Sequence, residues 1–234
     1  MKSYRGNAIA VGVLFIACSA ASLLSAVPLG STLDGPDYLR EVAVSDNRVV
    51  MTALIEFVWA AAGAGVAIGL YPIIRKYNPA LALGSVAGRV AEGVFVLIGA
   101  LSLLGLLTVS QQSLTAGSAV PSPFQATGDA LLAVRDWALL FVAMLAFGVG
   151  ALMYYYVFYR SRLVPRWLSG WGLVGGALML VSTVSSGFTQ DFGFTTVNTV
   201  LNIPIGLQEM VLAVWLIVKG FNPSALAADA ETQV

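Results

Sequence analysis

Long apolar stretches alternate with short polar segments along the whole chain. Six stretches are candidates for membrane-spanning helices, and they cover residues of about 7–28, 48–74, 80–110, 129–159, 167–188 and 196–218. Each is close to or longer than the roughly 20 residues that an α-helix needs to cross a bilayer. The pattern predicts an all-α polytopic membrane protein with a single domain of residues 1–234. Its six helices form one bundle, and residues 220–234 form a flexible C-terminal tail.

The first stretch can also be interpreted as a secretory signal peptide. It begins with basic residues, continues with an apolar run and ends near the small residues Ser25 and Ala26. The apolar run is roughly 20 residues long, whereas the core of a signal peptide typically has about 7–15 residues. We therefore expect a retained first helix.

Composition supports the membrane class and narrows the chemistry. Hydrophobic residues make up 58% of the chain and charged residues 10%, which leaves too few charges to cover a soluble domain. The net charge is zero, which argues against a nucleic-acid partner. The chain has no histidine and one cysteine, which excludes His-ligated haem, His-containing zinc sites and Ser–His or Cys–His nucleophiles. We expect no cofactor and no metal site, and the sequence does not favour an enzyme.

The basic residues predict the orientation of the bundle. Eight of the twelve Lys and Arg residues fall on one face, namely Lys2, Arg5, Arg75, Lys76, Arg160, Arg162, Arg166 and Lys219. The loops of the opposite face carry five acidic residues against Arg40 and Arg48. Because positive residues concentrate on the cytoplasmic side, we expect both termini in the cytoplasm and the protein in the bacterial inner (cytoplasmic) membrane.

Six ionisable residues lie inside the predicted spans, far from either interface. They are Glu56, Arg89, Glu92, Arg135, Asp136 and Glu209. A charged residue at the centre of a lone helix costs about 2.5–3.5 kcal/mol on insertion scales, so these groups should face the bundle interior or water. At a rise of about 1.5 Å per residue, they form a ladder. Arg89 lies nearest the cytoplasm, Glu92 and Glu209 near the midplane, and Glu56 and Arg135 above them.

Four carboxylates against two guanidiniums would leave a deficit of two positive charges in this interior. Three outcomes could relieve the deficit: protonation of one or two carboxyls, exposure of Asp136, or entry of a cation. Uncompensated acids inside a membrane are typical of proton- or cation-coupled sites.

The sixth span adds polar residues around a proline. Pro204 frees backbone carbonyls near Gln208 and Glu209, and Asn202 shares a helix face with Glu209. Discontinuous helices with a midplane acid are typical of binding sites in transporters. The candidate ligand- or ion-binding residues are therefore Glu56, Arg89, Glu92, Arg135, Asn202, Gln208 and Glu209.

Glycines four residues apart predict where helices approach closely. Three spans contain such pairs: Gly65 and Gly69, Gly84 and Gly88, and Gly172 and Gly176. Each pair forms a groove on one helix face, and we interpret these grooves as packing sites.

Several segments carry a family resemblance. They are NRVVMTALIEF from Asn47, LYPIIRKYNPALALG from Leu70, GRVAEGV from Gly88, RSRLVPRWLSGWGLVGGALML from Arg160 and PIGLQEMVLAVWLIVKGFN from Pro204. The chain resembles a bacterial family of six-span membrane proteins catalogued as domain of unknown function 4386. The resemblance implies a six-span integral membrane protein and no particular activity. The family's recurrent polar positions match Arg48, Glu56, Arg89, Glu92 and Glu209.

Three functions fit these observations. The first is a membrane protein that binds or transports a small ligand, a lipid or an ion at Glu209, Glu92 and Arg89. The second is a structural or regulatory membrane protein in which buried charges only hold helices together, as a homo-oligomer or with another membrane component. The third, a lipid-modifying enzyme, is the least favoured because no base lies beside a nucleophile. In every case the lipid bilayer is the expected surrounding.

Overall fold

The computed structural model describes residues 2–116 and 123–231, and all regular structure in these ranges is helical. Six helices are long and apolar enough to cross a membrane, which confirms the predicted six-span all-α class. The helices are α1 (Lys2–Leu24), α2 (Tyr38–Ala43), α3 (Asp46–Ile74), α4 (Pro79–Ala116), α5 (Pro123–Asp136), the π-helical η1 (Trp137–Val142), α6 (Ala143–Ser161), α7 (Arg166–Thr189), α8 (Thr196–Val218) and α9 (Pro223–Glu231).

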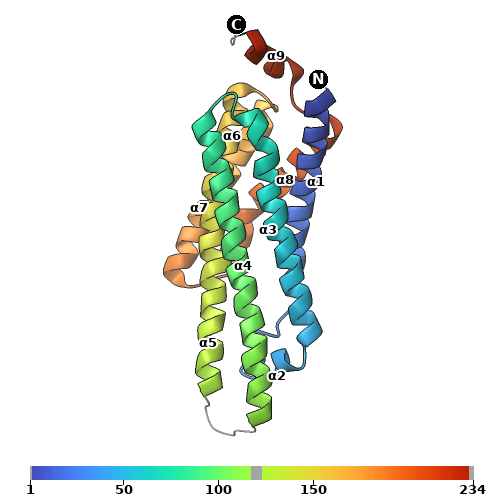
Figure 1. The fold of residues 1–234 in the computed structure, drawn as a ribbon. Coiled ribbons are helices and arrows are strands. Elements are labelled where there is room, and N and C mark those ends of the chain that lie inside the picture. Colours follow the sequence, from blue (N-terminus) through green and yellow to red (C-terminus); the bar gives the residue numbers. More distant parts are fainter. Residues whose placement is uncertain (1, 117–122, 232–234) are drawn as a thin grey trace.

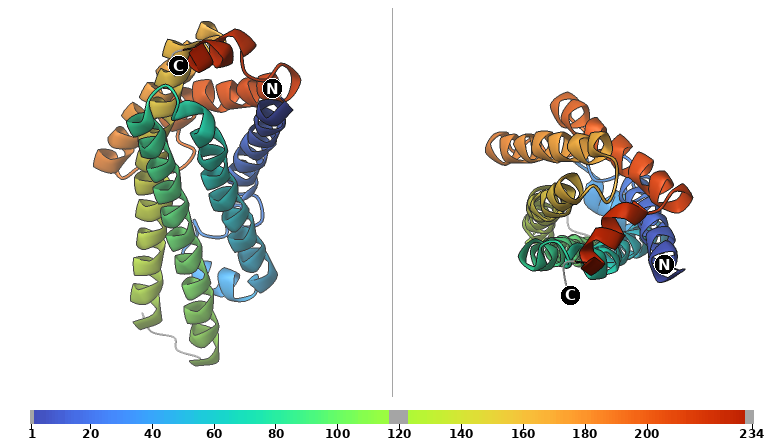
Figure 2. Two further views of the ribbon diagram at one scale, coloured as in Figure 1. Left: turned by 45° about the horizontal axis from the view of Figure 1, so that its top comes forward. Right: turned by 90° about the horizontal axis from the view of Figure 1, so that it is seen from above.

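The two chain termini lie at the same end of the bundle (Figure 1), which we call the terminal end. At the opposite end, which we call the distal end, α2 lies beside the ends of α4 and α5. Helices α3, α4, α5 and α6 run along the long axis of the molecule, whereas α7 and α8 are inclined to it (Figure 2). Helix α4 packs against α3, α5 and α6, and α1 packs against both α3 and α8. The inner faces of α1, α3, α4, α6 and α8 therefore surround one interior.

Outward-facing positions of the long helices are apolar. Large exposed hydrophobic side chains include Leu54 and Phe57 of α3, Leu101 of α4 and Val181 of α7. A soluble bundle would place polar residues at such positions, whereas lipid tails accept them. The surface of the bundle is therefore that of a multi-pass membrane protein.

The glycine grooves are contact sites, as the spacing predicts. A Cβ atom added at Gly88 would lie 2.7 Å from the Cα of Gly150, so α4 and α6 touch backbone to backbone. A Cβ at Gly69 would meet Val11 of α1, and one at Gly172 would meet the ring of Tyr155. These close approaches bring the polar residues of different helices within reach of each other.

A separate small hydrophobic core lies at the distal end. Helix α4 has 38 residues, or about 57 Å at 1.5 Å per residue, so it extends beyond a hydrocarbon core of about 30 Å. Tyr38 of α2 is buried there, and its hydroxyl donates a 2.7 Å hydrogen bond to Asp129 of α5. Burial, together with this carboxylate, raises the pKa of Tyr38 above its usual value.

The segment that the sequence predicts as a C-terminal tail contains the short helix α9. The hydroxyl of Tyr77, which follows α3, donates a 2.8 Å hydrogen bond to the carbonyl of Ala225 in α9. Residues 232–234 of the predicted tail lie outside the described residues.

Candidate functional site

Arg89 lies in the middle of the bundle, on the buried face of α4. The inward positions of this helix recur every three or four residues, so Arg89 and Glu92 point into the same interior. Arg89 Nη1 forms a 2.9 Å ion pair with Glu92 Oε2, and only 1% of the arginine side chain is exposed. Its Nε donates to the carbonyl of Gly63 and its Nη2 to Cys18 Sγ, each at 3.2 Å. The guanidinium also lies 4.7 Å from the ring centre of Phe147.

Gly63 of α3 has no side chain and so leaves space for Arg89. A Cβ atom at Gly63 would lie 3.0 Å from Arg89 Nη2, closer than side-chain contacts normally are. One turn along the same helix, the indole of Trp59 donates a 3.1 Å hydrogen bond to Glu92 Oε1. Helices α1, α3 and α6 therefore hold the Arg89–Glu92 pair in place.

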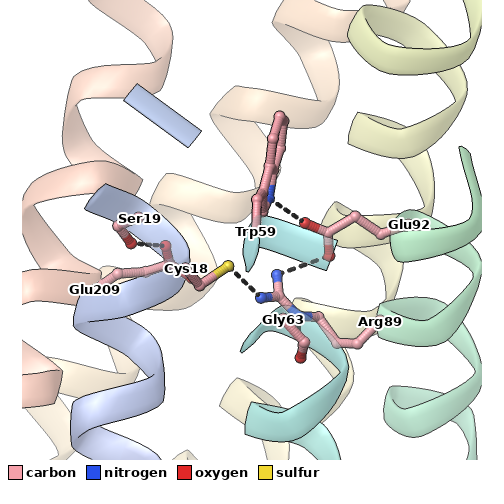
Figure 3. Close-up of polar contacts among 7 residues, drawn as sticks. All are labelled: Cys18, Ser19, Trp59, Gly63, Arg89, Glu92 and Glu209. Carbon is pink, nitrogen blue, oxygen red and sulfur yellow. Dashed lines mark hydrogen bonds and ion pairs between the residues drawn. The ribbon is translucent and has the colours of Figure 1, made fainter. Parts of the chain in front are cut away.

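Glu209 enters the same interior from α8. Ser19 of α1 donates a 3.2 Å hydrogen bond to Glu209 Oε2, whereas Oε1 is buried without a hydrogen-bond partner among the described residues. Figure 3 shows Glu209 and Ser19 on one side of Cys18, with Arg89, Glu92 and Trp59 on the other. Among the described residues no ion pair joins Arg89 to Glu209. We call Cys18, Ser19, Trp59, Arg89, Glu92 and Glu209 the central cluster.

A second pair of charges lies nearer the distal end. Arg135 of α5 binds Glu56 of α3 through two contacts, Nη2 to Oε1 at 2.5 Å and Nη1 to Oε2 at 3.2 Å. Arg135 Nη1 also donates a 3.0 Å hydrogen bond to the carbonyl of Gly99 in α4. We call Glu56 and Arg135 the distal ion pair. Both of its carboxylate oxygens are satisfied by one guanidinium.

The ladder expected from helix positions therefore separates into two parts. Arg89 and Glu92 are in direct contact and Glu209 joins them through α1, whereas Glu56 and Arg135 pair with each other. Asp136 is only half-buried. The deeply buried groups are then three carboxylates and two guanidiniums, a deficit of one positive charge in place of the two that the sequence suggests.

The other two candidate residues on α8, Gln208 and Asn202, do not contact the central cluster through any hydrogen bond among the described residues. Gln208 accepts a hydrogen bond from Tyr155 and donates one to the carbonyl of Leu168, which links α8 to α6 and α7. Asn202 is half-buried, and its Oδ1 has no hydrogen-bond partner among the described residues. Consecutive helical residues point about 100° apart, so Gln208 and Glu209 meet different neighbours.

A model of a protein family described as "Domain of unknown function (DUF4386)" matches residues 10–220. This range contains the central cluster and the distal ion pair. The chain belongs to the DUF4386 family. A search of curated proteins and a search of solved structures each returned no match.

Sequence reasoning did not single out Cys18, Ser19 or Trp59 as part of the DUF4386 central cluster. All three lie in apolar runs, where small or aromatic residues are common for packing reasons. Among the described residues, no group of three or more His, Cys, Asp and Glu side chains lies in a position to hold a metal ion.

Proposed function

We propose that this protein is a proton-coupled membrane carrier in which Glu209 binds and releases a proton inside the bundle. The observation that supports the proposal is the surplus carboxyl: Glu56 and Glu92 each have a guanidinium partner, and Glu209 has none within ion-pair distance among the described residues. An ionised carboxylate in this position is strongly disfavoured, and adding a proton removes the surplus charge.

The contacts of Glu209 are compatible with reversible protonation of its carboxyl. Glu209 Oε2 accepts a hydrogen bond from Ser19, whereas Oε1 has no hydrogen-bond partner among the described residues, so a proton can bind at Oε1 without breaking the contact with Ser19. Glu209 lies nine residues before the end of α8, or about 14 Å along this inclined helix, so its carboxyl is away from both helix ends. Alternating access requires that a proton bound at such an interior site can be released to either side.

Orientation forms part of the proposal. Both termini lie at the end of the bundle that carries most of the basic residues (Figure 1). By the positive-inside rule this end faces the cytoplasm, in a bacterial cytoplasmic membrane.

The test measures protonation of a buried carboxyl directly. Infrared difference spectra are recorded on the protein in lipid vesicles while the pH is stepped between acidic and alkaline values. We expect wild type to show a protonated-carboxyl band typical of a dry environment that disappears at alkaline pH, and Glu209→Gln to lack it. Asp191→Asn is the control, because Asp191 is an exposed loop residue and should leave this band unchanged.

A titrating band that survives in folded Glu209→Gln would show that the proton binds elsewhere, and the absence of any such band in wild type would overturn the proposal. A second readout is proton uptake into vesicles under an imposed membrane potential. Uptake should be present in wild type and Asp191→Asn and lost in Glu209→Gln.

A structural role is the second candidate, because Arg89 alone touches α1, α3, α4 and α6. In that case the charges hold helices together and need no ligand. Glu209→Gln would then change thermal stability while the infrared and uptake measurements showed no titrating site in either protein.

A further inference from the structure

A pocket at the terminal end of the bundle is lined by positively charged side chains, and none of its lining residues belongs to the central cluster. It has a volume of about 540 Å³ and lies between the loop that joins α6 to α7 and the end of α8. Arg162, Arg166 and Lys219 line it, and within the part of the chain that the structure describes no carboxylate is among its lining residues. No ion pair among the described residues involves any of the three. Arg166 also lies over the ring of Tyr159, 5.5 Å from its centre, and this contact leaves the guanidinium without a counter-ion.

Two loops are fixed against each other around this pocket. Asn222 donates a side-chain hydrogen bond of 3.2 Å to the carbonyl of Arg162 and a backbone hydrogen bond of 2.8 Å to the carbonyl of Leu163. Arg162 itself has a left-handed backbone with φ of 58°, which is costly for a residue with a side chain. Arg162 ends α6 in this conformation, and together with the contacts of Asn222 this fixes the position of its backbone beside the pocket.

The carbonyl groups at the C-terminal end of α8 are bound by a different cation. Arg5 of α1 donates hydrogen bonds to the carbonyls of Leu216, Ile217 and Val218 at that end. Helix carbonyls attract cations, and here Arg5 already fills that role. Lys219, the next residue, is exposed and remains a lining residue of the pocket.

The apolar part of the pocket indicates the source of the anion. Trp215 and Phe221 line it beside the three cations, and exposed Trp167 packs edge-on against Trp215 at 6.5 Å. Tryptophan at the end of a membrane helix is typical of the level of lipid headgroups. A pocket that is both cationic and aromatic at this level fits a phosphodiester and the first atoms of its glycerol.

We propose that the pocket of Arg162, Arg166 and Lys219 binds the phosphate headgroup of an anionic membrane lipid. The arginines contact phosphate oxygens, with Lys219 as a third positive charge, and the apolar wall formed by Trp215 and Phe221 accepts the glycerol end of the lipid. This site is independent of the proton proposed at Glu209, which lies on the interior face of α8.

Native mass spectrometry from micelles tests the site with two lipids of identical acyl chains, phosphatidylglycerol and phosphatidylcholine. The variant is Arg162→Gln/Arg166→Gln/Lys219→Gln. Its control is Arg75→Gln/Lys76→Gln/Arg160→Gln, which removes the same charge from the same end of the bundle but replaces none of the residues that line the pocket. We expect phosphatidylglycerol to bind wild type and the control, and to bind the pocket variant at least about tenfold more weakly.

Other outcomes would overturn the proposal. Equal weakening in both triple variants would mean general surface attraction. Equal binding of the two lipids, both of which contain a phosphodiester, would mean that the pocket does not select an anionic headgroup. Displacement of phosphatidylglycerol by excess inorganic phosphate would assign the pocket to a free anion. If the triple variant misfolds, Lys219→Gln alone should weaken phosphatidylglycerol binding by severalfold, and no change in that variant would contradict the assignment.

Discussion

The distal ion pair and the central cluster use the same residue types in one bundle, and they differ in charge balance. In the distal ion pair one guanidinium meets one carboxylate through two contacts, and a backbone carbonyl takes a further donor. In the central cluster the one guanidinium pairs with Glu92, whereas Glu209 has no ion-pair partner and its Oε1 has no hydrogen-bond partner among the described residues. A buried carboxylate whose charge is balanced by a guanidinium needs no further partner. A buried carboxylate without such a partner requires a proton or another cation.

The difference also appears in how the two parts are held. The distal ion pair joins α3 to α5 and is followed at once by the π-helical turn η1. The central cluster draws on α1, α3, α4 and α8, and its polar contacts include the weak acceptor Cys18 Sγ. We therefore expect the first to govern stability and the second to govern function, and four predictions test that division from the largest effect to the smallest.

The largest effect should follow removal of one partner of the distal ion pair. Arg135→Met leaves Glu56, whose side chain is fully buried, without a counter-charge. Breaking a buried pair in this way typically costs about 3–5 kcal/mol of folding free energy. Denaturant titration in detergent micelles, followed by tryptophan fluorescence, measures the loss.

The matched control removes both charges together. Glu56→Leu/Arg135→Met should recover most of the stability lost in Arg135→Met, since replacing a whole buried pair by apolar residues is often neutral or stabilising. If the double variant is as unstable as the single one, the loss comes from packing and the charge argument fails for this pair.

Sequence reasoning predicted much of the fold and part of the site. Apolar length alone predicts six spans, because the bilayer fixes how long each must be. The Arg89–Glu92 contact follows from a spacing of three residues on one helix. The pairing of Glu56 with Arg135 does not follow from any spacing, because it depends on which helices adjoin. Cys18 and Ser19 enter the cluster only through the packing of α1, and short-range patterns do not encode that choice.

The second prediction concerns the contact beside Arg89. A Cβ at Gly88 would lie 2.7 Å from the Cα of Gly150 and 2.9 Å from the carbonyl of Ala146, so α4 and α6 must separate in Gly88→Ala. Overpacking of this kind costs about 1–3 kcal/mol. The same denaturant titration measures it, and the infrared band proposed for Glu209 should shift because Arg89 moves with its helix.

Gly206→Ala provides the control for this substitution. No atom lies within 4 Å of a Cβ added at Gly206, which is also within a long helix. We expect its stability to equal that of wild type or to rise slightly. Equal losses in the two variants would mean that the α4–α6 approach has no special role.

The third prediction concerns the hydrogen bond that secures the distal end, where α5 carries Arg135. Tyr38→Phe removes the donor to Asp129 and should lower stability by about 1–2 kcal/mol at neutral pH. The pKa of Tyr38 is raised in the folded protein, so its contribution is fully present below the unfolded value of about 10 and is lost as the pH rises above it. The stability gap between wild type and Tyr38→Phe should therefore shrink above about pH 10. A gap that stays constant across that range would assign the loss to packing of the ring.

The smallest change in stability should come from the residue most important for the proposed function. Glu209→Gln removes the surplus charge, and the amide oxygen can still accept the hydrogen bond from Ser19. Its folding free energy should stay within about 1 kcal/mol of wild type, since a neutral side chain avoids the cost of a buried unpaired charge. Glu56→Gln is the matched comparison: it leaves Arg135 without its counter-ion and should lose several times more stability in the same titration. If the two glutamine variants lose equal stability, the central cluster is as structural as the distal ion pair, and the division between the two regions is wrong.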